Sequence, residues 1–516
     1  MPATYGDYMR DRTGWFFGLT GVQLGLLLVS GIPVWAAVNG ARWGWLAVWV
    51  PLWGLVTLLV VVPVRGWSSA QWLGLLLAHA WGRVTGWTDW QSAVAASVSG
   101  APDSRGRPSR RPVDVDAADL PGVLAGVQVH DGPPYGAAMS RVAVIQNHPS
   151  RTWAAAARIE HRGLGLTEGE VRDRMGTGLA ELCEAATRTE LVDVVAIQVR
   201  TVPDDGAERQ DWVNRHRRDS SPPLAREVNE LLAAQLMPAS VRSEAFVTVV
   251  VTEDRIGRAA KRAGGGVPGR ARILYGALSE IEARLLGTMG CSRVSWLDSP
   301  ALAVAIRTGF EPGDRASLAA AEIAHRSDPG VATGVPLAAA GPTTAASELR
   351  QYIHGDWASI TDTILLPDQG AVLGALAPVL VPSAVGERRS LTVFFTPVTA
   401  AVADKITGRE EMSAITGSEL RRRTGRLERA KERRAVTRVK ATDEKLARGR
   451  SLVRASAALS VTVPADWSTA EFGRRLDAAV RLAGYVPQRL DGAQDSAFAA
   501  ATIPLGIGVR QRRGRR

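Results

Sequence analysis

The residues that come nearest to a known binding motif form a glycine-rich stretch, Gly264-Gly-Gly-Val-Pro-Gly-Arg-Ala271. It has the outline of the phosphate-binding loop G-x-x-x-x-G-K-[ST], in which a lysine reaches the phosphates and a hydroxyl binds Mg²⁺. Arg270 stands in place of the lysine, and Ala271, which cannot bind a metal, stands in place of the hydroxyl. The preceding segment 255–263 is basic and helical in pattern, whereas a phosphate loop follows a strand. We interpret the glycines as a flexible hinge between a strand and a helix.

Histidines and cysteines offer little else for acid–base or metal chemistry. The seven histidines are scattered, and Cys183 and Cys291 match no metal-ligand spacing. In the segment His354-Gly-Asp-Trp357 an aspartate could orient a histidine, but a turn before a strand explains the same residues. The sequence contains no GxSxG, HExxH or CxxC motif. We therefore predict no enzyme activity, no cofactor and no metal site.

Two long apolar runs, Trp15–Val38 and Trp43–Val64, give the strongest structural signal in the chain. Neither contains a charged residue, and each is long enough for a helix to cross about 30 Å of hydrocarbon. The short segment 39–42 between them allows only a tight antiparallel hairpin. A signal peptide would have a shorter apolar core, and a buried helix of a soluble protein rarely stays uncharged over this length. The runs therefore predict a transmembrane helical hairpin.

Tryptophans near the ends of these runs favour the same interpretation, because indole side chains prefer the headgroup region. The residues that we assign to the membrane interface are Trp15, Trp43, Trp45, Trp67 and Trp72. Most arginines around the runs lie outside the hairpin turn, which carries only Arg42. This excess predicts that both termini lie in the cytoplasm. Together with the hairpin, it predicts a multi-pass integral protein of the cell (inner or plasma) membrane, with membrane lipid as a partner.

Strand and helix patterns alternate through the rest of the chain and predict an α+β fold, with mixed cytoplasmic modules that contain ferredoxin-like units. The clearest boundary is a stretch rich in Ser, Gly, Pro and Arg at 95–118. The predicted segments are a cytoplasmic N-terminus 1–13, the hairpin 14–66 with helices at about 15–38 and 43–64, a juxtamembrane amphipathic helix 67–94, the linker 95–118, a first α+β module 119–310, a linker or insertion 311–345, a second α+β module 346–508 and a basic tail 509–516.

The net charge of +11 is concentrated in that tail and in a basic helical pattern at about 400–450. The arginines of this pattern that could form a binding surface are Arg421, Arg422, Arg423, Arg426, Arg429, Arg433 and Arg434. Acidic residues interleave with them and favour a solvated helix with i,i+3 ion pairs. Attraction to anionic headgroups or to nucleic-acid phosphates stays open as an alternative. Few aromatic residues interleave, which argues against a platform for single-stranded nucleic acid.

Several segments together resemble a family of membrane proteins encoded in actinobacterial conjugation-type, or type IV secretion-like, loci. These segments are the start Tyr5-Gly6, the apolar hairpin, the pattern GWSSAQWL…GRVTGWTDWQS at 66–92, the helix start Pro222-Pro-Leu-Ala-Arg226 and the ending SAFAAATIPLG at 496–506. Members look like a short inner-membrane secretion subunit joined to the N-terminal, non-ATPase domain of the conjugation traffic ATPase. The resemblance covers nearly the whole chain and supplies no catalytic residues.

The resemblance implies a non-catalytic scaffold that acts through protein–protein interaction in a conjugation-type DNA or protein transfer apparatus. Its expected partners are a separate traffic ATPase, which it would anchor, and other membrane subunits of the apparatus. Two other classes stay open: the two-span membrane subunit of a type VII secretion complex, and a membrane-tethered nucleotide-binding enzyme. Nucleotide binding that depends on Gly269 and Arg270 would favour the last of these.

Overall fold

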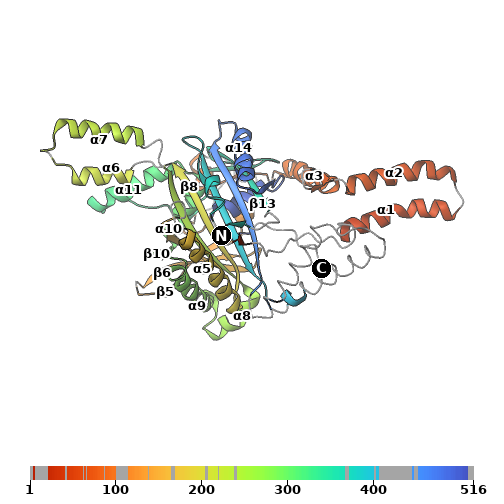
Figure 1. Cartoon of the computed structure of the whole chain (residues 1–516), viewed down its shortest axis with the longest axis horizontal. Coiled ribbons are helices and arrows are strands. Elements are labelled where there is room, and N and C mark those ends of the chain that lie inside the picture. The colour runs from red at the N-terminus through yellow and green to blue at the C-terminus, as the bar shows by residue number, and fades with distance from the viewer. Residues whose placement is uncertain are drawn as a thin grey trace. The chain divides into compact units, whose positions relative to one another are not determined.

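The computed structural model describes residues 4–5, 21–40, 43–61, 63–64, 67–86, 88–99, 114–137, 139–163, 169–203, 207–218, 220–236, 241–365, 371–372, 374–399, 402–405, 444, 446 and 451–508. The chain divides into two compact units, which we describe separately. One unit comprises 9–88, and the other comprises 1–8 together with 89–516 (Figure 1).

The smaller unit consists of helices α1 (Gly21–Asn39), α2 (Trp43–Val61) and α3 (Ser69–Thr85), with the short paired strands β2 (Pro63–Val64) and β3 (Trp67–Ser68). α1 and α2 form an antiparallel pair in which the Trp53 indole donates to the Leu27 carbonyl at 3.2 Å. Gly31 makes room for this indole, because a Cβ there would lie 3.2 Å from Trp53 Nε1.

Over the residues that the structure describes, no helix combines the length and apolar character needed to cross a bilayer. α1 begins only at Gly21 and α2 ends at Val61, so both are shorter than the predicted spans 15–38 and 43–64. The prediction of a transmembrane hairpin is therefore wrong. The predicted cell-membrane localisation, multi-pass with both termini cytoplasmic, is wrong for the same reason.

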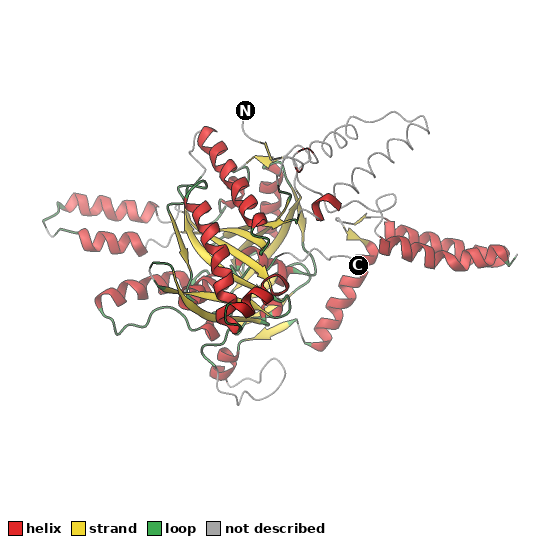
Figure 2. Cartoon of the chain, turned by 90° about the horizontal axis from the view of Figure 1, so that it is seen from below, coloured by secondary structure: helices red, strands yellow, loops and turns green. Residues whose placement is uncertain are grey.

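The larger unit is an α+β structure built on one 13-stranded antiparallel sheet. Figure 2 shows helices lying against both faces of its strands. The strands are β4 (Asp89–Gln91), β5 (Val127–Tyr135), β6 (Ser140–Asn147), β7 (Thr152–Glu160), β8 (Val192–Pro203), β9 (Val241–Thr252), β10 (Arg293–Trp296), β11 (Thr344–Ser347), β12 (Tyr352–His354), β13 (Trp357–Leu365), β15 (Arg388–Pro397), β16 (Val453–Pro464) and β17 (Val486–Arg489). Separately, β1 (Thr4–Tyr5) pairs with β14 (Ala371–Val372). The fold-class prediction, taken whole, is wrong because it included the membrane hairpin.

Helices of this unit differ in length and in what they cover. They are α4 (Ala93–Ser99), α5 (Gly169–Arg188), α6 (Ala207–His216), α7 (Pro223–Leu236), α8 (Glu253–Arg262), α9 (Gly266–Leu286), α10 (Ser299–Phe310), α11 (Asp314–Ser327), α14 (Thr469–Leu482) and α15 (Gln494–Thr502), with 3₁₀ turns η1 (Gly122–Leu124), η2 (Leu337–Ala339) and η3 (Ala377–Leu380). α5, α9 and α14 cover one face of the sheet, and α10 and α15 cover the other.

The sheet contains the same arrangement of strands twice. In the first repeat (127–310) the order is β10-β7-β9-β8, and in the second repeat (344–502) it is β17-β13-β16-β15. Numbered within each repeat, both orders are 4-1-3-2, the order of a ferredoxin-like βαββαβ unit. In both repeats a hairpin precedes the first strand and one extra helix, α10 or α15, follows the last. Equivalent backbone bonds agree as well: Glu253 N–H donates to Arg151 O at 2.9 Å, and Ala465 N–H donates to Asp356 O at 2.8 Å.

The two repeats join edge to edge through β8 and β15, which pair antiparallel from Val195↔Phe395 to Thr201↔Arg389. We call this junction the seam. Alternate residues of these strands face the two helical layers, so the seam is buried on both faces. On the α15 side, Gln198 Nε2 and Thr392 Oγ1 both donate to the Ala501 carbonyl, each at 2.9 Å. The seam therefore holds the helices of both repeats as well as their strands.

Candidate functional site

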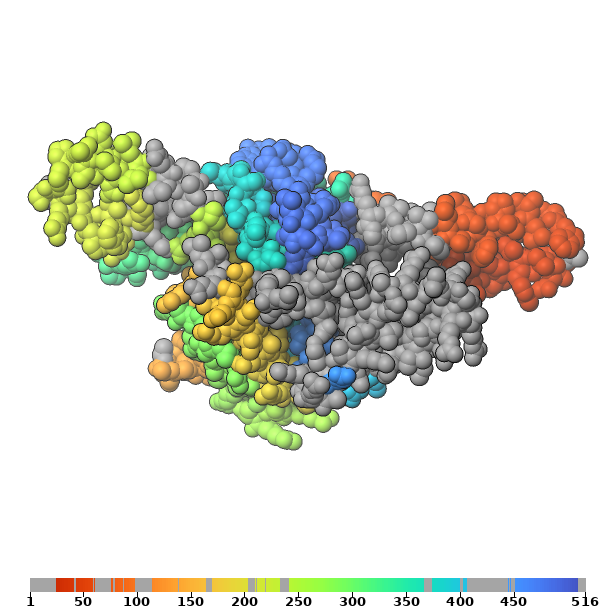
Figure 3. All heavy atoms as spheres, in the orientation of Figure 1, coloured from red at the N-terminus to blue at the C-terminus, as the bar shows by residue number. Residues whose placement is uncertain are grey.

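Helices α6 and α7 form an antiparallel pair, the α6–α7 arm, inserted between the paired strands β8 and β9. Figures 1 and 3 show the arm standing away from the sheet beside α11. Pro223 at the start of α7 favours a helix there, because its fixed φ suits the first turn. Arg209 Nη2 donates to Asn229 Oδ1 at 2.8 Å and links the two helices. Arg326 of α11 lies 3.6 Å from Asp211 of α6, so the arm meets the body at this helix.

One face of α7 carries a stripe of exposed apolar side chains: Leu224, Val228, Leu231 and Leu232. Their spacing places them on one side of a helix, the pattern of a helix that packs against another surface. Leu224 is 71% exposed and Leu231 is 57% exposed. On α6, Trp212 is 57% exposed and stacks on His216 with ring centroids 4.3 Å apart. A helix of this length is marginal alone in water, so an unpacked stripe is unusual for a monomer.

The glycine-rich stretch lies at the junction of α8 and α9. Gly264, Gly265 and Gly266 all have positive φ, which only glycine adopts readily, and they turn the chain between the two helices. Arg270 Nε and Nη2 donate to the two carboxylate oxygens of Glu253, and the Trp153 indole donates to the same carboxylate at 2.6 Å. The hydrogen bond from Arg270 lowers the pKa of Glu253. Arg270 is thus held by the protein's own carboxylate.

Beside this junction lies a cleft of about 410 Å³. Its lining comprises Gln146, Asn147, His148, Arg151, Thr152, Trp153, Glu253, Gly266, Val267 and Arg270. Amides at the start of a helix can attract an anion. The charges of the cleft are largely balanced, however, because Glu253 faces Arg270 and Arg151 lies 3.1 Å from Asp254. The cleft could hold a small polar molecule, but it lacks the lysine and the hydroxyl of a phosphate loop.

Gly269 has a packing role that a substitution can test. A Cβ at this position would lie 2.4 Å from the Ala260 carbonyl oxygen, whereas a Cβ at Gly276 in the same helix meets nothing within 4 Å. We expect Gly269→Ala to lower the free energy of unfolding by about 1–3 kcal/mol, because α8 must move away from α9. Gly276→Ala is the matched control and should be neutral or stabilising by up to about 1 kcal/mol. Urea denaturation measures both, and equal stability of the two variants would contradict the packing role.

His354 lies in the core between the rings of Phe310, Tyr352 and Phe498. Its Nε2 is 2.8 Å from Ser359 Oγ. Burial, with the nearby Arg388 charge, lowers the pKa of His354 to about 3, so the ring is neutral at ordinary pH. A fully buried, neutral histidine without a carboxylate partner among the described residues is placed for packing, not for acid–base work on a substrate.

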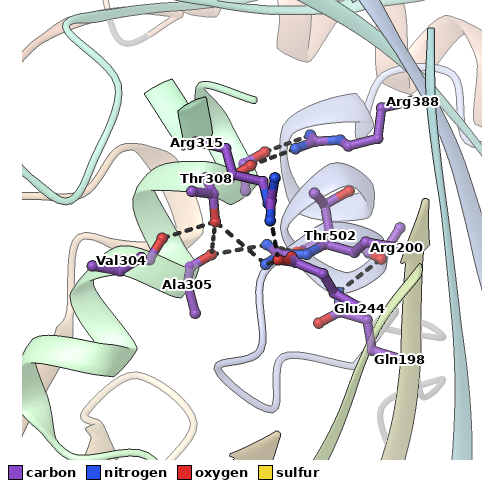
Figure 4. A network of polar contacts seen from close by, with 11 residues as sticks. Gln198, Arg200, Glu244, Val304, Ala305, Thr308, Arg315, Arg388 and Thr502 are labelled. Carbon is purple, nitrogen blue, oxygen red and sulfur yellow. Dashed lines mark hydrogen bonds and ion pairs between the residues drawn. The ribbon is translucent and has the colours of Figure 1, made fainter. Parts of the chain in front are cut away.

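A network of buried charges lies where α10, α11 and the seam meet (Figure 4). Arg200 donates to the Ala305 carbonyl and to Glu244 Oε2, each at 2.8 Å, and Arg388 donates to the carbonyls of Thr308 and Gly309. These guanidiniums satisfy carbonyls at the C-terminal end of α10, where cations are favoured.

Glu244 is the acidic centre of this network. Burial alone would raise the pKa of Glu244, but attraction by Arg200, Arg158 and Arg315 outweighs it and lowers the pKa to about 2. Arg200 and Arg388 are 1% exposed. The network therefore fastens α10 to the seam and offers no open site.

The residues assigned from sequence to membrane and basic surfaces are spread over different parts of the chain. Trp43 and Trp45 lie at the start of α2 with exposed side chains, and Trp67 and Trp72 belong to β3 and α3. Trp15 lies outside the described residues, as do all seven arginines of the basic pattern: Arg421, Arg422, Arg423, Arg426, Arg429, Arg433 and Arg434.

The sequence-based reasoning missed the arm as a site. A helix beginning near Pro222 belongs to the patterns that it recognised, but exposure of the stripe is not visible in a sequence. The available signal was the spacing of Leu224, Val228 and Leu231 inside a long insertion between two strands. No protein-family model matches this chain, and a comparison with curated proteins finds no match either.

Proposed function

We propose that this chain is a non-catalytic docking component of a conjugation-type transfer apparatus, and that its partner is a traffic ATPase. The observation that carries the proposal is the α6–α7 arm, whose apolar stripe is exposed although the helix needs a packing partner. The nature of the partner comes from the resemblance in sequence, and the arm supplies a surface for it. Type VII secretion and nucleotide binding remain the alternatives, and among the residues that the structure describes no contact favours either of them.

The body of the protein suits such a role because it fixes the base of the arm. β8 and β9 pair along their whole length, and the pairing reaches Pro203↔Val241 at the arm's base. Each flanking strand also has a further partner, β15 along Val195–Thr201 of β8 and β7 along Ala245–Thr252 of β9, so both strands are held in the sheet just before the base. A helical pair on such a base can present its stripe in a fixed direction. Recognition of an amphipathic helix in an apolar groove is a common mode of protein docking.

Removing the arm tests the proposal directly. Because Pro203 and Val241 are paired, residues 204–240 can be replaced by a two-residue Asn-Gly turn without moving either strand. We expect the shortened chain to fold with an unchanged circular dichroism spectrum, and to lose at least tenfold in affinity for the traffic ATPase of the same locus. The full chain is the control, with affinity measured by biolayer interferometry. Undiminished binding by a folded armless chain would refute docking through the arm.

A further inference from the structure

Three exposed arginines lie where α6 leads into α7: Arg217 and Arg218 in the connecting segment, and Arg226 at the start of α7. We call these three residues the arm tip. Within the part of the chain that the structure describes, none of the three has a carboxylate partner. Arg215 differs, because its guanidinium lies 2.7 Å from Asp211 on the same helix. The first turn of α7 contains no acidic residue, and Arg226 lies near that end, where the helix dipole disfavours a cation.

Charge and apolar surface are arranged in order along the arm. The cations lie at the tip, the stripe begins beside them at Leu224, and it continues along α7 to Leu232. In the sequence, Asp219 follows Arg218, so the segment 217–226 has three arginines and one acidic residue; Glu227 and Glu230 follow on α7. A surface that complements the arm must therefore be apolar along its length and acidic at one end. This polarity would also fix the direction in which the arm lies.

We propose that the arm binds an apolar groove on the traffic ATPase, and that acidic residues line the rim of this groove around the arm tip. This inference rests on the proposed docking function. A nucleic acid would neutralise the arginines but leave the stripe in water, so it matches only half of the surface. An uncharged apolar groove would desolvate the arginines without compensation. The acidic rim accounts for both features, and it would speed association through electrostatic steering.

The test compares charge reversal at the tip with matched changes elsewhere. The variants are Arg217→Glu/Arg218→Glu for the tip, Leu231→Glu for the stripe, and Arg474→Glu and Leu482→Glu as controls on exposed positions of α14. Affinity of the full chain for the traffic ATPase is measured at 50 and 300 mM NaCl. We expect the tip variant to lose at least tenfold at 50 mM NaCl and to recover part of that loss at 300 mM NaCl, because salt screens the repulsion between the new glutamates and the acidic rim. The stripe variant should lose affinity at both salt concentrations, and the controls should bind like the parent.

A charge swap then identifies the rim. A photo-crosslinking residue at position 228 marks the groove, and neighbouring Asp or Glu residues of the ATPase are changed to Lys. We expect these changes to restore at least threefold of the affinity lost by Arg217→Glu/Arg218→Glu. If the tip variant binds like the parent, or no acidic residue lies near the crosslink, the inference is wrong while the docking function stands.

Other outcomes would show that the arm binds something other than the ATPase. If the parent chain does not bind the ATPase at all, the proposed function itself fails, and the inference fails with it. Binding that disappears after nuclease treatment would assign the tip to a nucleic acid and overturn the inference. A dimer of the chain, seen by light scattering and lost in both tip and stripe variants, would assign the arm to a second copy, with the same consequence.

Discussion

Replacing Arg200 by leucine should lower the free energy of unfolding by about 3–5 kcal/mol, which is the typical cost of removing one partner of a buried ion pair while the other keeps its charge. The substitution leaves Glu244 in the core with only Arg158 and Arg315 nearby. It also removes the guanidinium that donates to the Ala305 carbonyl near the end of α10, although the Thr308 hydroxyl still donates to this carbonyl. Denaturation in urea, followed by tryptophan fluorescence, gives the measurement.

Two further variants make this result specific. Arg188→Leu removes an exposed ion pair with Glu184 on α5 and should change stability by less than about 1 kcal/mol. Arg200→Leu/Glu244→Leu removes both buried charges and should be more stable than Arg200→Leu alone, because no carboxylate is left uncompensated. A loss below about 1 kcal/mol for Arg200→Leu would show that the network does not fasten α10 to the seam.

Glu311→Gln should make the stability of the protein less dependent on pH. Glu311 follows α10 and is buried, and burial raises the pKa of its carboxyl from 4.5 to about 7. Below pH 4.5 the carboxyl is protonated in both folded and unfolded chains, so it has no effect on their balance. As pH rises from 4.5 to about 7, the unfolded chain ionises first, and the folded state loses stability by up to about 3 kcal/mol. Glutamine cannot ionise, so the variant avoids this loss.

The measurement is the free energy of unfolding of both proteins between pH 4 and pH 8. We expect Glu311→Gln to gain on the parent steadily up to about pH 7 and then to keep a constant advantage. Glu322→Gln, on an exposed stretch of α11, is a control that should follow the parent. A constant difference between Glu311→Gln and the parent at every pH would mean that Glu311 ionises normally in the fold.

Local patterns in the sequence predicted local structure better than they predicted its assembly. The alternation of strand and helix patterns indicates an α+β body, which is what the larger unit has. The same logic applied to 15–38 and 43–64 predicted membrane spans, which the described helices do not support. Apolar composition alone did not determine where each helix begins and ends. α1 starts at Gly21, well inside the first apolar run.

The internal repeat could not be predicted from the sequence, because what the two repeats share is their main-chain arrangement. Equivalent bonds from Glu253 to Arg151 and from Ala465 to Asp356 join main-chain atoms, so the side chains at these positions are free to differ. Pairing of β8 with β15 is also hidden, since Thr201 and Arg389 are partners in the register although they are 188 residues apart in the chain. For the candidate site, spacing revealed the helix α7 but not its exposure, which depends on what the rest of the fold leaves uncovered.

The seam has a consequence for how the chain is made. During synthesis β8 leaves the ribosome long before β15. Until β15 is made, the β8 edge of the first repeat therefore has no strand to pair with. An unpaired edge invites pairing with strands of other chains, and contacts between distant residues form slowly. β8 does carry the buried Arg200 near one end of this edge, and an inward-pointing charge is a known way to discourage such pairing. The Arg200 guanidinium, which later binds α10, would thus also keep the open β8 edge of the newly made first repeat from pairing with strands of other nascent chains on the same messenger RNA.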